Sequence, residues 1–308
     1  MRVLLALAVL LVALLALPPL GYAVFPASLP ELPPAGRRVE VSDGLGVNVI
    51  ERGAGPPVVL VHGHPGCAYE WETVMDALAE RGLRAIAYDR VGYGRSDPRP
   101  RGRVAVETNA RELLELLAAL DLRDVTLVGA SYGGATSIVA AKRDPARLAR
   151  LVLVGSVGPG IEGYRLPGPL MELLAGPVLS WVARVPPVAQ RVRADFLANA
   201  FHPDPVPAWF QRLAEANFAR PGTLDAFRSE GRDLGGEADL DPGSIRLPIL
   251  VFQGDADRLV PPAVAENIHA RAPQAELRMV PQAGHALPIT HTALLADALA
   301  EFADPTGR

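Results

Sequence analysis

Ser131 stands between two glycines at the end of an apolar β-type segment, residues 125–128, in a setting typical of an activated nucleophile. The turn from such a strand into the following small-residue helix is tight. The positions two residues before and after the serine must therefore lack bulk, and Gly129 and Gly133 meet that need. The hydroxyl is then exposed at the carboxyl end of the strand. The Tyr132 N–H lies at the start of the helix, where the helix dipole favours negative charge.

A serine nucleophile needs a base and a group that orients the base. His285 follows the last predicted strand, where a loop brings the imidazole back over the sheet edge. Asp255 and Asp257 both follow the preceding strand, and either could orient the base. The chain order serine, aspartate, histidine is the one that a nucleophile turn of this kind requires. Three other histidines fall in surface or packing positions: His202, His269 and His291.

The loop after the predicted strand 58–61 carries His62 and His64. We expect the backbone N–H of His64 to join that of Tyr132 in holding an oxyanion. A metal site on the two histidines fails on ligand count, because no further His, Asp or Glu follows before Glu70. The chemistry expected of the serine needs no cofactor and no metal.

Strands and helices alternate along most of the chain. A hairpin is predicted over residues 38–52, with its turn at Asp43 and Gly44. Predicted strands cover residues 58–61, 84–88, 125–128, 151–154, 249–252 and 277–280. Predicted helices cover residues 69–81, 104–120, 135–142, 262–271 and 292–302. The pattern predicts an α/β fold with a mostly parallel, doubly wound sheet covered on both faces.

The alternation breaks between Ser156 and Pro248, where the chain is far longer than one crossover needs. We expect a helical cap at about residues 158–245, over the carboxyl edge of the sheet. Its aromatic residues either line an acyl pocket or only pack the cap on the main domain. They are Trp181, Phe196, Phe201, Trp209, Phe210, Phe218 and Phe227.

Composition narrows the class of protein. The chain has 308 residues, 49% hydrophobic and 21% charged, which suits a packed globular core. The net charge is −4 and no basic tract is present, so we expect no nucleic-acid partner. Cys67 is the only cysteine, so no internal disulfide forms, and a packing role is expected for it because a better nucleophile exists.

Residues 1–25 are predicted to be a signal peptide or an N-terminal membrane anchor. Arg2 is followed by an unbroken apolar run, and 3–25 is just long enough to span a bilayer. A Pro-rich linker, 26–36, precedes the domain at 37–308 and favours a membrane-anchored exported protein over a secreted or periplasmic one. A membrane is thus a possible partner through this segment.

Taken in order, these segments resemble the α/β-hydrolase superfamily, specifically its capped serine hydrolases. The resemblance extends over about residues 38–303 and is carried by the runs 62–66, 89–96, 129–133, 254–261 and 284–285. In that pattern the acid lies three residues after the glycine that ends the strand, which selects Asp257 over Asp255. The 89–96 run resembles a structural turn beside the site, without a catalytic role.

The resemblance implies a hydrolase of small to medium apolar carboxylic esters, acting through an acyl-enzyme on Ser131, His285 and Asp257. Haloalkane dehalogenases and epoxide hydrolases carry an aspartate in place of this serine. Proline iminopeptidases usually carry Trp in place of Tyr132, and the triple-glycine loop of hormone-sensitive-type esterases is absent. Three alternatives stay open: a cofactor-free haloperoxidase or perhydrolase, a proline-iminopeptidase-like amide hydrolase, and a non-catalytic ligand-binding protein.

Overall fold

An eight-stranded sheet forms the centre of the molecule, as seen in the computed structural model, which describes residues 30–99, 105–161, 186–220, 222–233 and 238–303. The strands are β1 Arg37–Glu40, β2 Gly46–Arg52, β3 Pro57–Val61, β4 Arg84–Tyr88, β5 Val125–Ala130, β6 Leu148–Val154, β7 Ile249–Gly254 and β8 Ala275–Val280. Their order is β1-β2-β4-β3-β5-β6-β7-β8. The pairs β1–β2 and β2–β4 are antiparallel and all others are parallel, so the predicted hairpin and mostly parallel sheet are confirmed.

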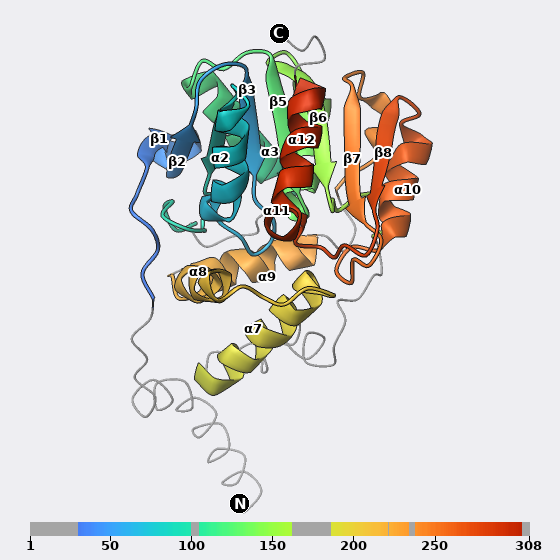
Figure 1. Ribbon diagram of the computed structural model, residues 1–308. Coiled ribbons are helices and arrows are strands. Elements are labelled where there is room, and N and C mark those ends of the chain that lie inside the picture. Colours follow the sequence, from blue (N-terminus) through green and yellow to red (C-terminus); the bar gives the residue numbers. More distant parts are fainter. Residues whose placement is uncertain (1–29, 100–104, 162–185, 221, 234–237, 304–308) are drawn as a thin grey trace, which may run out of the picture.

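Helices cover both faces of the sheet (Figure 1). The described helices are η1 Ser42–Gly44, η2 Ala68–Trp71, α2 Glu72–Glu80, α3 Val106–Ala119, α4 Tyr132–Arg143, α7 Pro186–Phe201, α8 Ala208–Phe218, α9 Thr223–Asp233, η3 Pro242–Ser244, α10 Pro262–Arg271, α11 Leu287–Thr290 and α12 Thr292–Ala303. Helices α3, α4 and α10 pack on one face, and α2 and α12 pack on the other. The predicted α/β class is therefore confirmed.

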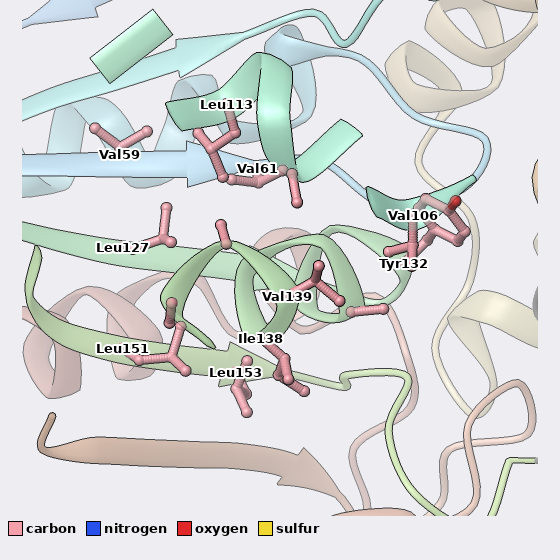
Figure 2. Packing of buried hydrophobic residues seen from close by; sticks show 14 of the residues in the cluster. Val59, Val61, Val106, Leu113, Leu127, Tyr132, Ile138, Val139, Leu151 and Leu153 are labelled. Atoms are coloured by element: carbon pink, nitrogen blue, oxygen red, sulfur yellow. The ribbon is translucent and has the colours of Figure 1, made fainter. Parts of the chain in front are cut away.

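The residues of β3 show how the core is divided between the two faces. Val59 and Val61 belong to the cluster on the α3, α4 and α10 side, whereas Val58 and Leu60 belong to the cluster on the α2 and α12 side. All four are fully buried, as expected of a parallel strand covered on both faces. Figure 2 shows part of the first cluster, where Leu127, Leu151 and Leu153 of the strands lie beside Ile138 and Val139 of α4. Close packing on both faces makes the strand ends a rigid platform for side chains.

Helices α7, α8 and α9, which we call the cap helices, lie between β6 and β7 in sequence. In Figure 1 they lie together beyond one end of the strands, close to α11. Two of the aromatic residues expected in the cap, Phe210 and Phe218, lie on α8. Residues 162–185, with Trp181, lie outside the described part of the chain, and the predicted cap limits of 158 and 245 stay a prediction.

The predicted localisation requires a correction. A helix needs about 20 apolar residues to cross a bilayer. Among the described residues no helix is long and apolar enough to do so, and the longest, α7, has 16 residues. This finding contradicts the membrane-anchored, exported localisation expected from the sequence, and that expectation is withdrawn. The segment 1–25 on which it rested, and residues 26–29 of the predicted linker, lie outside the described residues.

Candidate active site

Ser131 occupies the turn between β5 and α4. Its backbone dihedrals, φ 52° and ψ −122°, fall in a region that residues other than glycine rarely adopt. Close backbone approach explains the flanking glycines. A Cβ at Gly129 would lie 2.3 Å from the carbonyl oxygen of Gly133, and a Cβ at Gly133 would lie 2.3 Å from that of Val61. The predicted need for small residues on both sides of the serine is thus confirmed.

Asp257 and His285 form a direct hydrogen bond, with 2.7 Å between Oδ2 and Nδ1. The Asp257 side chain is fully buried, and its Oδ1 accepts the backbone N–H groups of Leu259 at 2.8 Å and Val260 at 2.9 Å. Its Oδ2 also accepts the Gln253 amide at 3.1 Å, so three groups besides the imidazole donate to this carboxylate, and an ionised carboxylate can only accept. Nδ1 of His285 therefore carries the ring proton of the neutral imidazole, and Nε2 is left as the basic nitrogen.

Asp255 takes a different position, although it lies only two residues away. Its exposed side chain accepts the backbone N–H of Gln282 at 2.7 Å and so closes the turn that precedes His285. Of the two aspartates that the sequence left as candidates, the structure thus brings Asp257, and not Asp255, onto the imidazole.

The loop that carries His285 is anchored on cap helix α7. The carbonyl oxygen of Ala200 accepts the backbone N–H groups of both His285 (3.1 Å) and Ala286 (3.0 Å). The loop and the cap approach so closely that a Cβ at Gly284 would lie 1.9 Å from the His202 carbonyl oxygen. The position of the imidazole therefore depends on the cap as well as on the sheet.

Ser131, His285 and His64 line one pocket. The cap helices supply its apolar side: Phe196, Leu197 and Phe201 from α7, and Phe210, Leu213 and Phe218 from α8. Within the described residues no hydrogen bond joins the Ser131 hydroxyl to the imidazole, and contacts of this kind often tighten only around a reactant. Four of the aromatic residues proposed for a pocket thus line one, whereas Trp209 is 39% exposed.

The loop after β3 forms another wall of this pocket. The side chains of both of its histidines are hydrogen-bonded to backbone groups. Nε2 of His62 accepts the backbone N–H of Arg90 at 2.9 Å, so Nδ1 bears the proton and donates to the Gly63 carbonyl at 2.9 Å. Nε2 of His64 donates to the Phe227 carbonyl at 2.6 Å, and the two rings stack at 4.3 Å. Burial lowers the pKa of both imidazoles, with the Arg90 charge acting in the same direction, so both are neutral near pH 7.

The predicted structural turn at 89–96 contains two buried charges with different surroundings. The Asp89 carboxylate accepts the backbone N–H groups of Ala68 (2.6 Å) and Arg95 (2.8 Å) and the Asn48 amide (2.8 Å). These bonds tie the turn to η2 and β2, as a structural role requires. The neighbouring Arg90 instead reaches the Gly63 carbonyl at 2.8 Å, which the sequence did not reveal.

Sequence reasoning also missed Glu70 and Asn217, which contribute polar groups to the pocket. Burial raises the pKa of Glu70 to about 8, although the Cys67 backbone N–H and the Arg90 charge oppose the shift. Asn217, on α8, donates to the Gly66 carbonyl and accepts the Gly94 N–H, each at 2.9 Å, so it fastens the cap to two loops. Glu70 could have been suspected from its place in the first loop, whereas nothing in the sequence singles out Asn217.

The single cysteine is buried, whereas His269 is exposed and His291 is half-buried, both outside the pocket lining. Cys67 is buried and belongs to the core cluster on the α2 side, and burial raises the pKa of its thiol well above the ordinary value. Nδ1 of His269 donates to the Ala275 carbonyl at 2.7 Å, and His291 bonds to the Thr290 hydroxyl at 2.9 Å. The packing role expected for Cys67 is confirmed.

Comparison with known proteins identifies the family. The model of the family described as alpha/beta hydrolase fold matches residues 56–292. The chain belongs to this family. The superfamily resemblance inferred from the motifs is confirmed, and relatives of this hydrolase are themselves named as hydrolases or as non-heme haloperoxidases.

Two relatives and one solved structure illustrate the range of the family. A 2-hydroxy-6-oxo-2,4-heptadienoate hydrolase from Pseudomonas putida is 33% identical over 261 residues, 80% of this chain and 89% of the relative. A non-heme haloperoxidase from Rhodococcus erythropolis is 30% identical over 260 residues, 81% of this chain and 92% of the relative. An esterase structure from Exiguobacterium antarcticum superposes with a TM-score of 0.73 at 24% identity, over 87% of this chain and 99% of that one, and shows the shared fold.

Proposed function

We propose that this hydrolase cleaves small to medium, uncharged carboxylic esters through an acyl-enzyme formed on Ser131. One observation carries the proposal. The serine, in its unusual backbone conformation, lines the same pocket as an imidazole whose Nδ1 is held by Asp257 at 2.7 Å. A nucleophile, a base and a group that orients the base therefore meet at one sheet edge.

In the proposed reaction, Oγ of Ser131 attacks the ester carbonyl while Nε2 of His285 takes the hydroxyl proton. The carbonyl π pair becomes an oxyanion, which the N–H groups of His64 and Tyr132 stabilise. Collapse of this intermediate expels the alcohol, which receives the proton from Nε2. Water then attacks the acyl-enzyme by the same route and releases the acid. No cofactor takes part in these steps.

The lining of the pocket supports an uncharged substrate. Among the described residues that form it, none is Lys or Arg, and the only acidic one, Glu70, is largely protonated at pH 7 because its pKa is about 8. A carboxylate-bearing substrate would find no cation to replace its hydration there, whereas an alkyl or aryl ester would contact the apolar residues of α7 and α8.

A second candidate is hydrolysis of a carbon–carbon bond in a 2-hydroxy-6-oxo-dienoate, which the relative at 33% identity favours. The same serine and histidine would serve it, but that substrate carries a carboxylate. Perhydrolysis is a further candidate because one relative is named a haloperoxidase, and it would use peroxide in place of water.

A substrate panel tests the proposal. Purified protein is assayed with p-nitrophenyl esters of two to twelve acyl carbons, with a 2-hydroxy-6-oxo-dienoate, and with an acetate ester in the presence of peroxide. Ser131→Ala is the control, and a fluorophosphonate probe with peptide mapping locates the nucleophile. We expect ester turnover that depends on Ser131 and labelling of Ser131. Labelling elsewhere, or faster turnover of the dienoate, would contradict the proposal.

A further inference from the structure

A buried ion pair joins the cap to the turn after β4. One guanidinium nitrogen of Arg90 bonds to Oε1 of Glu230, which lies on cap helix α9. Both side chains are at most 1% exposed. Glu230 also accepts the Tyr93 hydroxyl at 2.7 Å and the Asn109 amide at 3.0 Å, so its carboxylate has several donors.

The second guanidinium nitrogen of Arg90 donates to the carbonyl oxygen of Gly63 at 2.8 Å. That oxygen also accepts Nδ1–H of His62 at 2.9 Å, and His62 is itself fixed by the Arg90 backbone N–H. One carbonyl thus receives two donors from the same small cluster. A charge-assisted bond of this kind fixes the peptide plane and polarises the peptide group.

The carbonyl of Gly63 and the N–H of His64 belong to one peptide group. This bond is trans, so the N–H points away from the carbonyl. With its carbonyl held by Arg90, the peptide packs against the serine: a Cβ at Gly63 would lie 3.0 Å from the Ser131 Cβ. Among the described residues, no acceptor is bonded to the His64 N–H, which leaves it available to a ligand of the pocket.

We propose that Glu230 is a positioning residue for catalysis: through Arg90 it orients and polarises the Gly63–His64 peptide, whose N–H holds the oxyanion. This inference rests on the proposed function and adds to it a path from the cap to the reacting atoms. The cap then does more than shape the pocket. Its helix α9 supplies the carboxylate that holds Arg90 against the Gly63 carbonyl in the loop after β3.

The ionisation of Glu230 agrees with this arrangement. Burial opposes its negative charge, but the charge of Arg90 and the hydrogen bonds from Arg90 and Tyr93 hold the pKa of Glu230 below its ordinary value. The Arg90 side chain is also enclosed by two aromatic rings, with its guanidinium carbon 4.7 Å from the Tyr93 ring centre and 4.9 Å from that of Tyr132. A cation in this position has few alternative partners, so loss of the Glu230 charge should disturb it directly.

The test compares binding of an oxyanion with binding of an uncharged ketone. A trifluoromethyl ketone accepts Oγ of Ser131: the Oγ–C bond forms, the proton moves to Nε2 of His285 and the carbonyl π pair becomes an oxyanion. The matching methyl ketone occupies the same pocket mainly as the unreacted carbonyl. The ratio of their inhibition constants therefore reports on oxyanion stabilisation. If Glu230 acted only in folding, its substitution would leave this ratio unchanged.

Glu230→Gln is the main variant, since it keeps the shape and removes the charge. We expect kcat to fall on the order of tenfold with KM within about twofold, and trifluoromethyl ketone binding to weaken by the same factor as kcat/KM. Methyl ketone binding should not change. Glu215→Gln is the matched control, because it breaks the Arg193–Glu215 pair between α7 and α8 without touching the Arg90 cluster, and it should leave the ratio at the wild-type value.

A folded Glu230→Gln protein with an unchanged inhibitor ratio would overturn the inference. If that variant does not fold, Tyr93→Phe decides, because it removes a single donor to Glu230. We expect it to weaken trifluoromethyl ketone binding and kcat by about two- to threefold each, and no change would overturn the inference. Wild-type protein is tested first: an inhibitor adduct absent from Ser131 would instead refute the proposed function.

Discussion

The sheet edge and the cap contribute to the same pocket in different ways. The sheet edge supplies the polar groups: the serine from the end of β5, the acid after β7 and the imidazole after β8. The cap helices α7 and α8 supply mainly aromatic and aliphatic side chains. The groups of the proposed mechanism thus lie on the part of the molecule that is packed on both faces, where side chains are held most firmly. The helices of the cap line the pocket and so determine the shape of substrate that it can hold.

This division has three exceptions, in which a group of the cap holds a loop. The Asn217 amide on α8 bonds to the Gly66 carbonyl and the Gly94 N–H. The Ala200 carbonyl on α7 holds the loop of His285, and Glu230 on α9 holds Arg90 against the Gly63 carbonyl. If the proposed function holds, the cap acts on the chemistry by fixing loop backbones, whereas its apolar pocket-lining side chains act on substrate fit. Variants at the sheet edge should therefore change kcat, and variants in the cap lining should change KM.

The largest effect is expected at the nucleophile and the base. Ser131→Ala and His285→Ala should each lower kcat for a p-nitrophenyl ester on the order of 10³-fold or more, because these residues act as a unit. Steady-state kinetics measure the loss, and circular dichroism checks that both variants fold. Retention of more than about a tenth of the activity in either variant would remove that residue from the proposed mechanism.

The next effect separates the two aspartates of one loop. Asp257→Asn should reduce kcat severely, by roughly 10²- to 10⁴-fold, because the amide favours the wrong tautomer of His285. Asp255→Asn is the matched control and should change kcat by less than about threefold, since the amide oxygen still accepts the Gln282 N–H. The reverse ranking in a kcat comparison would assign the orienting role to Asp255.

A smaller effect is expected in the cap lining. Phe218→Ala removes an aromatic wall of the pocket, so KM for short-chain esters should rise by roughly three- to tenfold while kcat changes little. Trp209→Ala on the same helix is the control, because that ring is exposed and lies outside the pocket lining. Kinetics over a series of acyl chain lengths measure both. A Phe218→Ala variant that changed only kcat would contradict the expectation that variants in the cap lining change KM.

The smallest effect concerns the pH dependence of stability. The folded-state pKa of Glu70 is about 8 against an ordinary value of 4.5, because burial disfavours its charge. Between these values the folded protein binds the proton that the unfolded chain has lost, so this group lowers stability as pH rises from about 4.5 to about 8. The melting temperature of Glu70→Gln minus that of wild type should therefore be higher at pH 8 than at pH 5. Glu80→Gln, exposed at the end of α2, is the control and should track wild type at both values.

The sequence alone determined the parts of this protein that depend on local pattern. Alternating apolar runs and helical spacings predicted most strands and helices of the main domain, because their periodicity follows from which face is buried. The glycines around Ser131 predicted its tight turn, because only residues without a Cβ fit there. The structural turn at 89–96 was predicted from the family resemblance and not from local pattern, since Asp89 accepts N–H groups from Ala68 and Arg95 on different segments.

Only the tertiary structure decided which distant groups meet. Glu230 lies 140 residues from Arg90, in a helix whose sequence carries several other charges, and nothing local marks its partner. The same holds for the Ala200 carbonyl, which any residue could supply, and for the elevated pKa of Glu70, which arises from burial by other segments. Local spacing reports the backbone conformation of one segment, whereas burial and long-range pairing depend on how separate segments pack, and that packing is what connects the cap to the chemistry.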